Sequence, residues 1–267
     1  MVVTEAGKGG DWAERTYEAM APVYDDFTAH HDSEAWLADL VEAARRAGLA
    51  GQRLLDVGCG TGKSFLPLLR RGWQVTGCDI SPSMVERARE KAGDQVRLEV
   101  ADMRELPVFG EFDLAWCLDD AINYLLSEEE LVRALGGMRS NLAPTGLVAF
   151  DVNTLLVYRT FFAETETVER GGRRLVWRGQ EAADVEPGSV CESTLEVTSL
   201  EPAEGAEPTV HSHLQRHFPE VEVRAALERA GLECVDVYGH GYDGIFKQPL
   251  DESVHTKAIY IARVAGE

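Results

Sequence analysis

The chain has 267 residues, of which 45% are apolar and 27% charged, so it has the length and composition of a globular protein with a substantial core. Its 46 acidic and 26 basic residues give a formal net charge of −20, which opposes binding to the phosphate backbone of nucleic acid. No apolar run of about 18 residues predicts a transmembrane helix, residues 1–10 lack the apolar centre of a signal peptide, and five cysteines without framework spacing predict reduced thiols in the cytoplasm.

Residues 11–50 carry apolar side chains at helical spacing and are predicted to be helical. Trp12, Tyr17 and Tyr24 come first, and a second run begins at Trp36 and ends at Gly48. These aromatic side chains, together with His30 and His31, either contact a ligand or pack the segment onto the rest of the domain. The pattern leaves both interpretations open.

The most informative stretch is LLDVGCGTGK, residues 54–63. A short apolar run ends in an acid, Asp56, and opens into Gly58, Gly60 and Gly62. A helical pattern follows at residues 64–71. A strand, a glycine loop and a helix in this order predict a nucleotide-type site at the carboxyl edge of a parallel sheet.

The spacing of the glycines restricts the class of ligand that the loop can bind. The dinucleotide fingerprint needs a third glycine at the position that Lys63 occupies, and the Gly-Lys-Ser/Thr end of a phosphate-binding P-loop is absent from this stretch. Asp56 would repel a pyrophosphate, but it suits a cationic ligand such as an ammonium or a sulfonium.

Two further acids follow at matching places. Asp79 ends the next predicted strand, 23 residues after Asp56, and Asp102 follows a third strand at residues 96–100. Ser81 and Pro82 predict a helix start between them. An acid at the end of the second strand of such folds accepts hydrogen bonds from ribose hydroxyls.

The run DVGCGTG closely resembles the first motif of the class I S-adenosylmethionine-dependent methyltransferases. The resemblance covers residues 52–152 and includes a fourth strand at 111–118 and a fifth at 141–152. It implies an α/β, Rossmann-like fold: a seven-stranded, mostly parallel sheet with helices on both faces and an N-terminal helical lid over residues 11–50. Within this family the chain is most similar to enzymes that act on small molecules, including the sugar N-methyltransferases of antibiotic pathways.

The resemblance also implies where S-adenosylmethionine binds. Asp79 is expected at the ribose, Asp102 at the adenine amino group, and Met103 against the adenine ring. The residues expected at the cofactor are Asp56, Gly58, Gly60, Thr61, Gly62, Asp79, Ile80, Met84, Asp102, Met103, Leu118, Tyr24 and Trp36.

Residues 161–218 interrupt this pattern with β-type sequence. Gly171 and Gly172 predict a tight hairpin, and two more strands are expected at 189–198 and 209–217. We predict an antiparallel insertion that covers the active site or forms a homodimer. The cofactor-binding core is then expected to consist of residues 51–160 and 219–267.

One face of the last inserted strand carries His211, His213, Gln215 and His217. A general base (His213 or His217), a metal site and a solvated polar face are all compatible with this pattern. No acid or cysteine has the spacing of a further metal ligand, so no metal is expected. Tyr24 and Asp119 are the other candidates for catalysis, Asp119 because it follows the fourth strand, as do Asp120, Asn123 and Tyr124.

The sequence therefore predicts transfer of a methyl group from S-adenosylmethionine to a nitrogen or oxygen atom of a small molecule in secondary metabolism, with S-adenosylhomocysteine as product. No nucleic-acid or membrane partner is expected. Two alternatives stay open. One is a cofactor-binding protein without transferase activity; the other is an NAD-dependent oxidoreductase, against which Lys63 argues.

Overall fold

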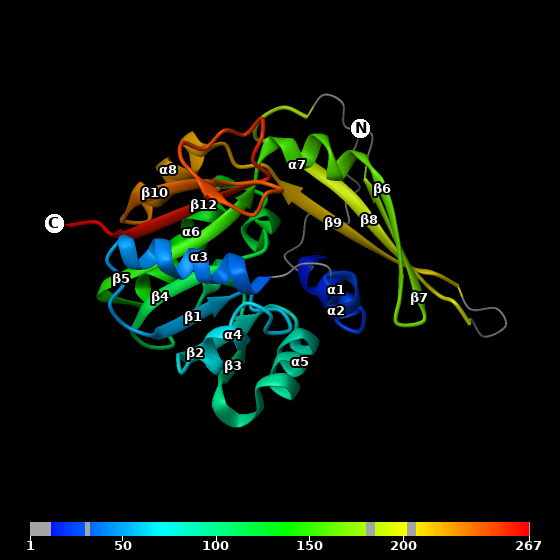
Figure 1. The fold of residues 1–267 in the computed structure, drawn as a ribbon, viewed down its shortest axis with the longest axis horizontal. Coiled ribbons are helices and arrows are strands. Elements are labelled where there is room, and N and C mark those ends of the chain that lie inside the picture. Colours follow the sequence, from blue (N-terminus) through cyan, green and yellow to red (C-terminus); the bar gives the residue numbers. More distant parts are fainter. Residues whose placement is uncertain (1–11, 30–32, 180–184, 202–206, 267) are drawn as a thin grey trace.

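The computed structural model describes residues 12–29, 33–179, 185–201 and 207–266, which form two β-sheets with helices around the larger one (Figure 1). The α-helices are α1 (Trp12–Met20), α2 (Tyr24–Phe27), α3 (Ser33–Arg46), α4 (Leu66–Arg70), α5 (Pro82–Ala92), α6 (Glu128–Ser140), α7 (Leu155–Arg159) and α8 (Glu220–Arg229). The strands are β1 (Arg53–Val57), β2 (Gln74–Asp79), β3 (Arg97–Val100), β4 (Phe112–Cys117), β5 (Leu142–Asn153), β6 (Thr165–Arg170), β7 (Arg173–Gly179), β8 (Val190–Ser199), β9 (Thr209–Arg216), β10 (Leu232–His240), β11 (Phe246–Lys247) and β12 (Lys257–Val264). Short 3₁₀ helices span Gly93–Gln95, Met103–Glu105, Ala121–Tyr124 and Phe161–Ala163.

The larger sheet has the strand order β11-β10-β12-β5-β4-β1-β2-β3. Strands β1 to β5 pair in parallel, and β12 is antiparallel to both β5 and β10. The predicted seven-stranded, mostly parallel sheet is confirmed, with the two-residue β11 added at one edge. The chain order reverses between β1 and β4, so a ligand is expected beyond the carboxyl ends of these strands.

Helices cover both faces of this sheet, as predicted. Leu54 and Leu55 are neighbours on β1 and point to opposite faces, because side chains alternate along a strand. Leu54 belongs to the cluster that contains α3 and Leu68 of α4, whereas Leu55 belongs to the cluster beneath α6 and α8. Helix α3 is thus part of the helix layer of the core. Within the predicted lid of residues 11–50, it is α1 and α2 that lie between the larger sheet and the second sheet (Figure 1).

The second sheet is the predicted antiparallel insertion, with the order β6-β7-β8-β9. Gly171 and Gly172 both have positive φ (57° and 73°) and connect the paired residues Arg170 and Arg173. This backbone conformation is the one that a two-residue hairpin of the favoured twist requires. Trp177 and other apolar side chains of the sheet pack in one cluster with Met20 of α1 and Met84 of α5, so the insertion is joined to the core through α1.

None of the helices within the described ranges has the length and apolarity that crossing a membrane requires.

Candidate active site

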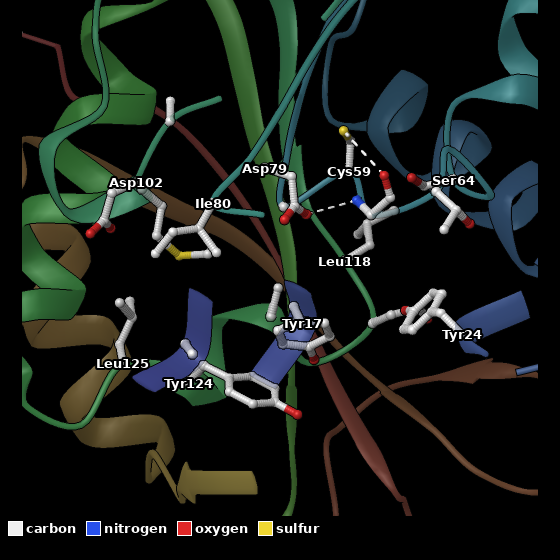
Figure 2. Close-up of a pocket in the computed structure, with 18 of the residues that line it drawn as sticks. Tyr17, Tyr24, Cys59, Ser64, Asp79, Ile80, Asp102, Leu118, Tyr124 and Leu125 are labelled. Atoms are coloured by element: carbon white, nitrogen blue, oxygen red, sulfur yellow. Dashed lines mark hydrogen bonds between the residues drawn. The ribbon is translucent and has the colours of Figure 1, made fainter. Parts of the chain in front are cut away.

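A pocket enclosing about 910 Å³, part of it open to solvent, lies at the carboxyl edge of the larger sheet (Figure 2). The loop after β1, the ends of β2 and β3, the turn after β4 and the helices α1 and α2 supply its walls. The pocket brings together the predicted site residues Tyr24, Gly58, Gly60, Thr61, Asp79, Ile80, Asp102, Met103, Leu118 and Asp119.

The glycine loop leaves space for a ligand. Gly58 and Gly60 have φ values of +73° and +51°, which side-chain-bearing residues rarely adopt. A Cβ atom at Gly58 would lie 3.1 Å from the Cβ of Ala121, and one at Gly60 would lie 3.8 Å from the Tyr24 ring across the pocket. Because both positions lack a side chain, a ligand can approach the backbone of the loop.

Asp79 is held by backbone donors at the end of β2. Its Oδ2 accepts a hydrogen bond from the Gly60 N–H at 2.8 Å, and its Oδ1 accepts one from the Ser81 N–H at 2.9 Å. Burial raises the pKa of this carboxyl group, and the backbone N–H donors oppose the rise. Each carboxylate oxygen can accept more than one hydrogen bond, and Asp79 lines the pocket, so its side chain can also accept from a ligand.

Asp102 has a partner that the sequence analysis missed. Nε of Arg104 donates to both carboxylate oxygens at 2.9 Å, and Nη2 lies 2.5 Å from Oδ2. Asp102 also accepts the backbone N–H of Arg104 at 2.8 Å. This bidentate pair orients the carboxylate at the pocket wall. The only sequence signal was an arginine two positions after the acid.

Two predicted cofactor residues of the glycine loop do not line the pocket. Asp56 lies beneath the loop, 1% exposed, where its Oδ2 accepts the Ser64 hydroxyl at 2.5 Å and burial raises its pKa to about 7. The expected direct contact with a cationic ligand is therefore wrong for Asp56. At Gly62, a Cβ would lie 2.8 Å from the Phe65 ring, so this glycine is required for packing behind the pocket.

Met84 and Trp36 were also predicted to contact the cofactor, but neither side chain lines the pocket. Met84 is fully buried in the cluster that joins α1, α5 and the second sheet. The Trp36 ring packs edge-on against His240 and Phe246, with centroid separations of 6.3 and 6.1 Å. Both side chains are used for packing because α3 and α5 are core helices.

Tyr17, Tyr24 and Tyr124 form a wall opposite Asp79 and Asp102 (Figure 2). The ring centroid of Tyr17 lies 6.2 Å from that of Tyr24 and 5.1 Å from that of Tyr124. Burial raises the pKa of all three phenols, so their hydroxyl groups are neutral at physiological pH.

The histidine-bearing face of β9 is buried, so its interpretation as a solvated face is wrong. His213 lies behind Tyr124: its Nδ1 is 2.7 Å from the Tyr124 hydroxyl oxygen, and burial lowers its pKa to about 4. His217 Nε2 lies 2.9 Å from Glu252, and its Nδ1 accepts the Gly188 N–H at 3.2 Å. Neither histidine lines the pocket, which corrects their assignment as a base acting directly on substrate. Among the described residues no group of three or more His, Cys, Asp or Glu side chains is placed to hold a metal ion.

Polar side chains fasten α1 and α2 over the pocket. Glu18 accepts hydrogen bonds from the Ser81 hydroxyl at 2.7 Å and from the hydroxyl and N–H of Ser83. Asp25 accepts the Thr61 hydroxyl at 2.7 Å and pairs with Lys91 at 2.6 Å. These contacts join helices from the start of the chain to the cofactor loops, and no local sequence pattern predicted them.

The parallel sheet, the glycine loop after β1 and the carboxylate at the end of β2 form a nucleotide-type site of the Rossmann-like class. A family profile described as a methyltransferase domain matches residues 54–146. The chain is 36% identical over 143 residues to a putative methyltransferase of Geobacillus sp., a match that covers 52% of this chain and 58% of that relative. It is 27% identical over 217 residues to the dTDP-3-amino-3,4,6-trideoxy-α-D-glucopyranose N,N-dimethyltransferase of Streptomyces venezuelae, covering 79% and 89% of the two chains.

Among solved structures, the amino pentose methyltransferase of Micromonospora echinaspora with bound S-adenosylmethionine has a TM-score of 0.67 and 25% identity, covering 91% of this chain and 97% of that one. The protein is a class I S-adenosylmethionine-dependent methyltransferase.

Proposed function

We propose that the protein transfers the methyl group of S-adenosylmethionine to an amine nitrogen of a small molecule, and that this acceptor is an amino sugar. One observation carries the choice of nitrogen: among the described residues that line the pocket there is no histidine, and the wall facing Asp79 consists of neutral phenols.

The residues present fit the cofactor. Asp79 would accept hydrogen bonds from the ribose hydroxyls, and Asp102 with Met103 would hold the adenine. The space above Gly58 and Gly60 would admit the methionine part against the loop backbone. When bound, S-adenosylmethionine supplies a methyl group that the sulfonium already activates.

The protein then has to align the acceptor and exclude water. Tyr17 of α1 and Tyr24 of α2 line the pocket from the covering helices, and the contacts of Glu18 and Asp25 keep those helices closed. The phenol rings present apolar faces and hydroxyl groups, a combination that suits a sugar.

The ionisation states of the side chains at the site favour a nitrogen atom over an oxygen atom as the methyl acceptor. A hydroxyl acceptor usually needs a general base whose pKa is near the working pH. His213 has a pKa of about 4 and does not line the pocket, so it is a weak base in the wrong place. Asp119, a pocket residue with a pKa of about 6, is assigned below to the positive charge of the cofactor. An amine needs only to be unprotonated before it attacks, a condition that solvent can meet. The names of the Streptomyces venezuelae and Micromonospora echinaspora proteins support an amino sugar as acceptor.

The test uses paired acceptors. Calorimetric titration should show saturable binding of S-adenosylmethionine and none of NADH. Formation of S-adenosylhomocysteine is then measured with an amino sugar nucleotide and with the same nucleotide carrying a hydroxyl in place of the amine. Methylation of the amine alone is expected. Methylation of the hydroxyl compound would overturn the nitrogen assignment, and tight binding without turnover on any amine would favour a cofactor-binding protein without transferase activity.

We also propose a homodimer through the second sheet and a reducing cytoplasmic compartment. The second proposal is supported by the free thiols of all five cysteines, Cys59, Cys78, Cys117, Cys191 and Cys234. Sedimentation of wild type and of a variant with charge reversals on β6 would test the dimer.

A further inference from the structure

The turn after β4 has an unusual backbone. Asp119 and Asp120 are consecutive residues with φ of 56° and 55°, the left-handed region that favours glycine. Such a conformation persists where the surrounding structure over-determines it, and it is concentrated at functional sites. Asp119 follows Leu118 on the pocket wall, and the residue is exposed.

Three strands hold this turn through Asp120. Its backbone N–H donates to Asp151 Oδ2 of β5 at 2.9 Å. Its Oδ2 accepts the side-chain amide of Gln215, on β9 of the second sheet, at 2.5 Å. Its Oδ1 accepts a hydrogen bond from Nζ of Lys257, at the start of β12, at 2.8 Å.

Lys257 also balances the negative charges of Asp120 and Asp151. The same Nζ lies 2.8 Å from Oδ2 of Asp151, whose side chain is fully buried. One ammonium therefore lies between two carboxylates, and a buried carboxylate left without its cation is strongly destabilising. Lys257 is 137 positions from Asp120 in the chain, and it lies behind the turn, outside the residues that line the pocket.

We propose that Lys257 is a positioning residue: it holds the Asp119–Asp120 turn in place and keeps the Asp119 carboxylate ionised toward the positive charge of S-adenosylmethionine. This inference rests on the proposed function only where it concerns turnover. The effect of Lys257 on the affinity for the cationic cofactor is measured separately.

The charges around Asp119 determine in which direction each substitution shifts the pKa of its carboxyl group. Desolvation by the surrounding pocket side chains raises the pKa of Asp119 to about 6, and Lys257 of β12 and Lys63 of the glycine loop oppose this rise. Asp120 of the same turn and Asp151 of β5 add to it, and Asp56 of β1 and Tyr24 of α2 are also coupled to Asp119. Removing the Lys257 charge should therefore raise the pKa of Asp119, whereas removing the Asp120 charge should lower it.

The experiment measures the affinity for S-adenosylmethionine by calorimetry from pH 5 to 9 in four variants of the full chain. In wild type, affinity should increase with pH as Asp119 ionises. In Lys257→Met the midpoint of this increase should move up by about one pH unit, and Lys257→Arg should restore it. Asp120→Asn should move the midpoint down. Arg263→Met removes an exposed cation of the same strand, paired with Glu233, and should leave the profile unchanged.

The position of the midpoint is diagnostic because a loss of packing would weaken binding at every pH. An unshifted midpoint in Lys257→Met, or a loss that arginine does not reverse, would overturn the proposal. If Lys257→Met does not fold, Asp120→Asn decides: a midpoint that does not move down overturns it. Wild type that binds S-adenosylmethionine but methylates no amine would contradict the proposed function alone, since the binding midpoints still test Lys257.

Discussion

The hydroxyl oxygen of Tyr124 lies 2.7 Å from Nδ1 of His213, and it is the tyrosine that faces the pocket. His213 is 2% exposed and packs beside the Trp177 ring, with 5.3 Å between ring centroids. A histidine in this position orients the phenol and does not itself line the pocket. The site is therefore an aromatic wall supported by the second sheet.

Burial of His213 should make stability depend on pH. Its pKa is about 4 in the folded protein and 6.5 unfolded, so the unfolded chain binds more protons between these values. The contribution is fully present above pH 6.5 and is lost as pH falls toward 4, by about 3 kcal/mol in total. Urea unfolding at pH 7.5, 6 and 5 should show a flatter dependence in His213→Gln than in wild type. Parallel curves for the two proteins would mean that His213 is not buried in its neutral form.

Asp79→Asn should weaken cofactor binding without unfolding the protein. The amide keeps the shape of the side chain but loses the charge that strengthens its hydrogen bonds, each worth about 1.5–3 kcal/mol. We expect the Kd for S-adenosylhomocysteine to rise by about tenfold or more, measured by calorimetry. Glu99→Gln, an ion-pair partner of Arg97 on β3 outside the pocket, is the matched control and should bind as wild type does. An unchanged Kd in Asp79→Asn would remove Asp79 from the ribose site.

Asp25→Asn should speed release of the cofactor, and its neighbour Asp26→Asn provides the control. Asp25 joins α2 to Thr61 of the glycine loop and to Lys91 of α5, whereas Asp26 lies 3.8 Å from Arg173 of the second sheet. Loss of the contacts of Asp25 with Thr61 and Lys91 should loosen the helices over the pocket. Stopped-flow displacement of S-adenosylhomocysteine should show a dissociation rate several-fold higher in Asp25→Asn only. Equal rates in the two variants would show that α2 does not retain the ligand through Asp25.

Gly62→Ala should destabilise the protein more than Gly72→Ala. Both glycines have positive φ, 88° and 85°, so alanine costs about 1–2 kcal/mol at either position. At Gly62 the new Cβ also meets the Phe65 ring at 2.8 Å, whereas at Gly72 nothing lies within 4 Å. Overpacking adds about 1–3 kcal/mol. Free energies of unfolding in urea measure the difference, and similar values for the two variants would contradict the packing role of Gly62.

The sequence patterns that succeeded are local. The continuous apolar runs of the buried strands β1 and β2, the glycines at φ-positive positions and the Ser81 cap of α5 each depend on a few neighbouring residues. The hairpin at Gly171 and Gly172 was readable for the same reason. The errors have a common origin as well. Trp36 and Met84 carry side chains that suit either a core or a ligand, and only the packing of their helices decides between the two.

The sequence by itself determined the sheet, the glycine loop and the acid at the end of β2, because backbone propensity and apolar runs act over a few residues. The cofactor followed from the resemblance of that loop to the first methyltransferase motif. The tertiary structure alone decided how the pocket is completed. Glu18 reaches Ser81, Tyr124 reaches His213, and Lys257 lies between Asp120 and Asp151 across separations of 63, 89, 137 and 106 positions. Such pairs have no signature in the chain, since any distant charged or aromatic residue could serve until the strand order places one of them there.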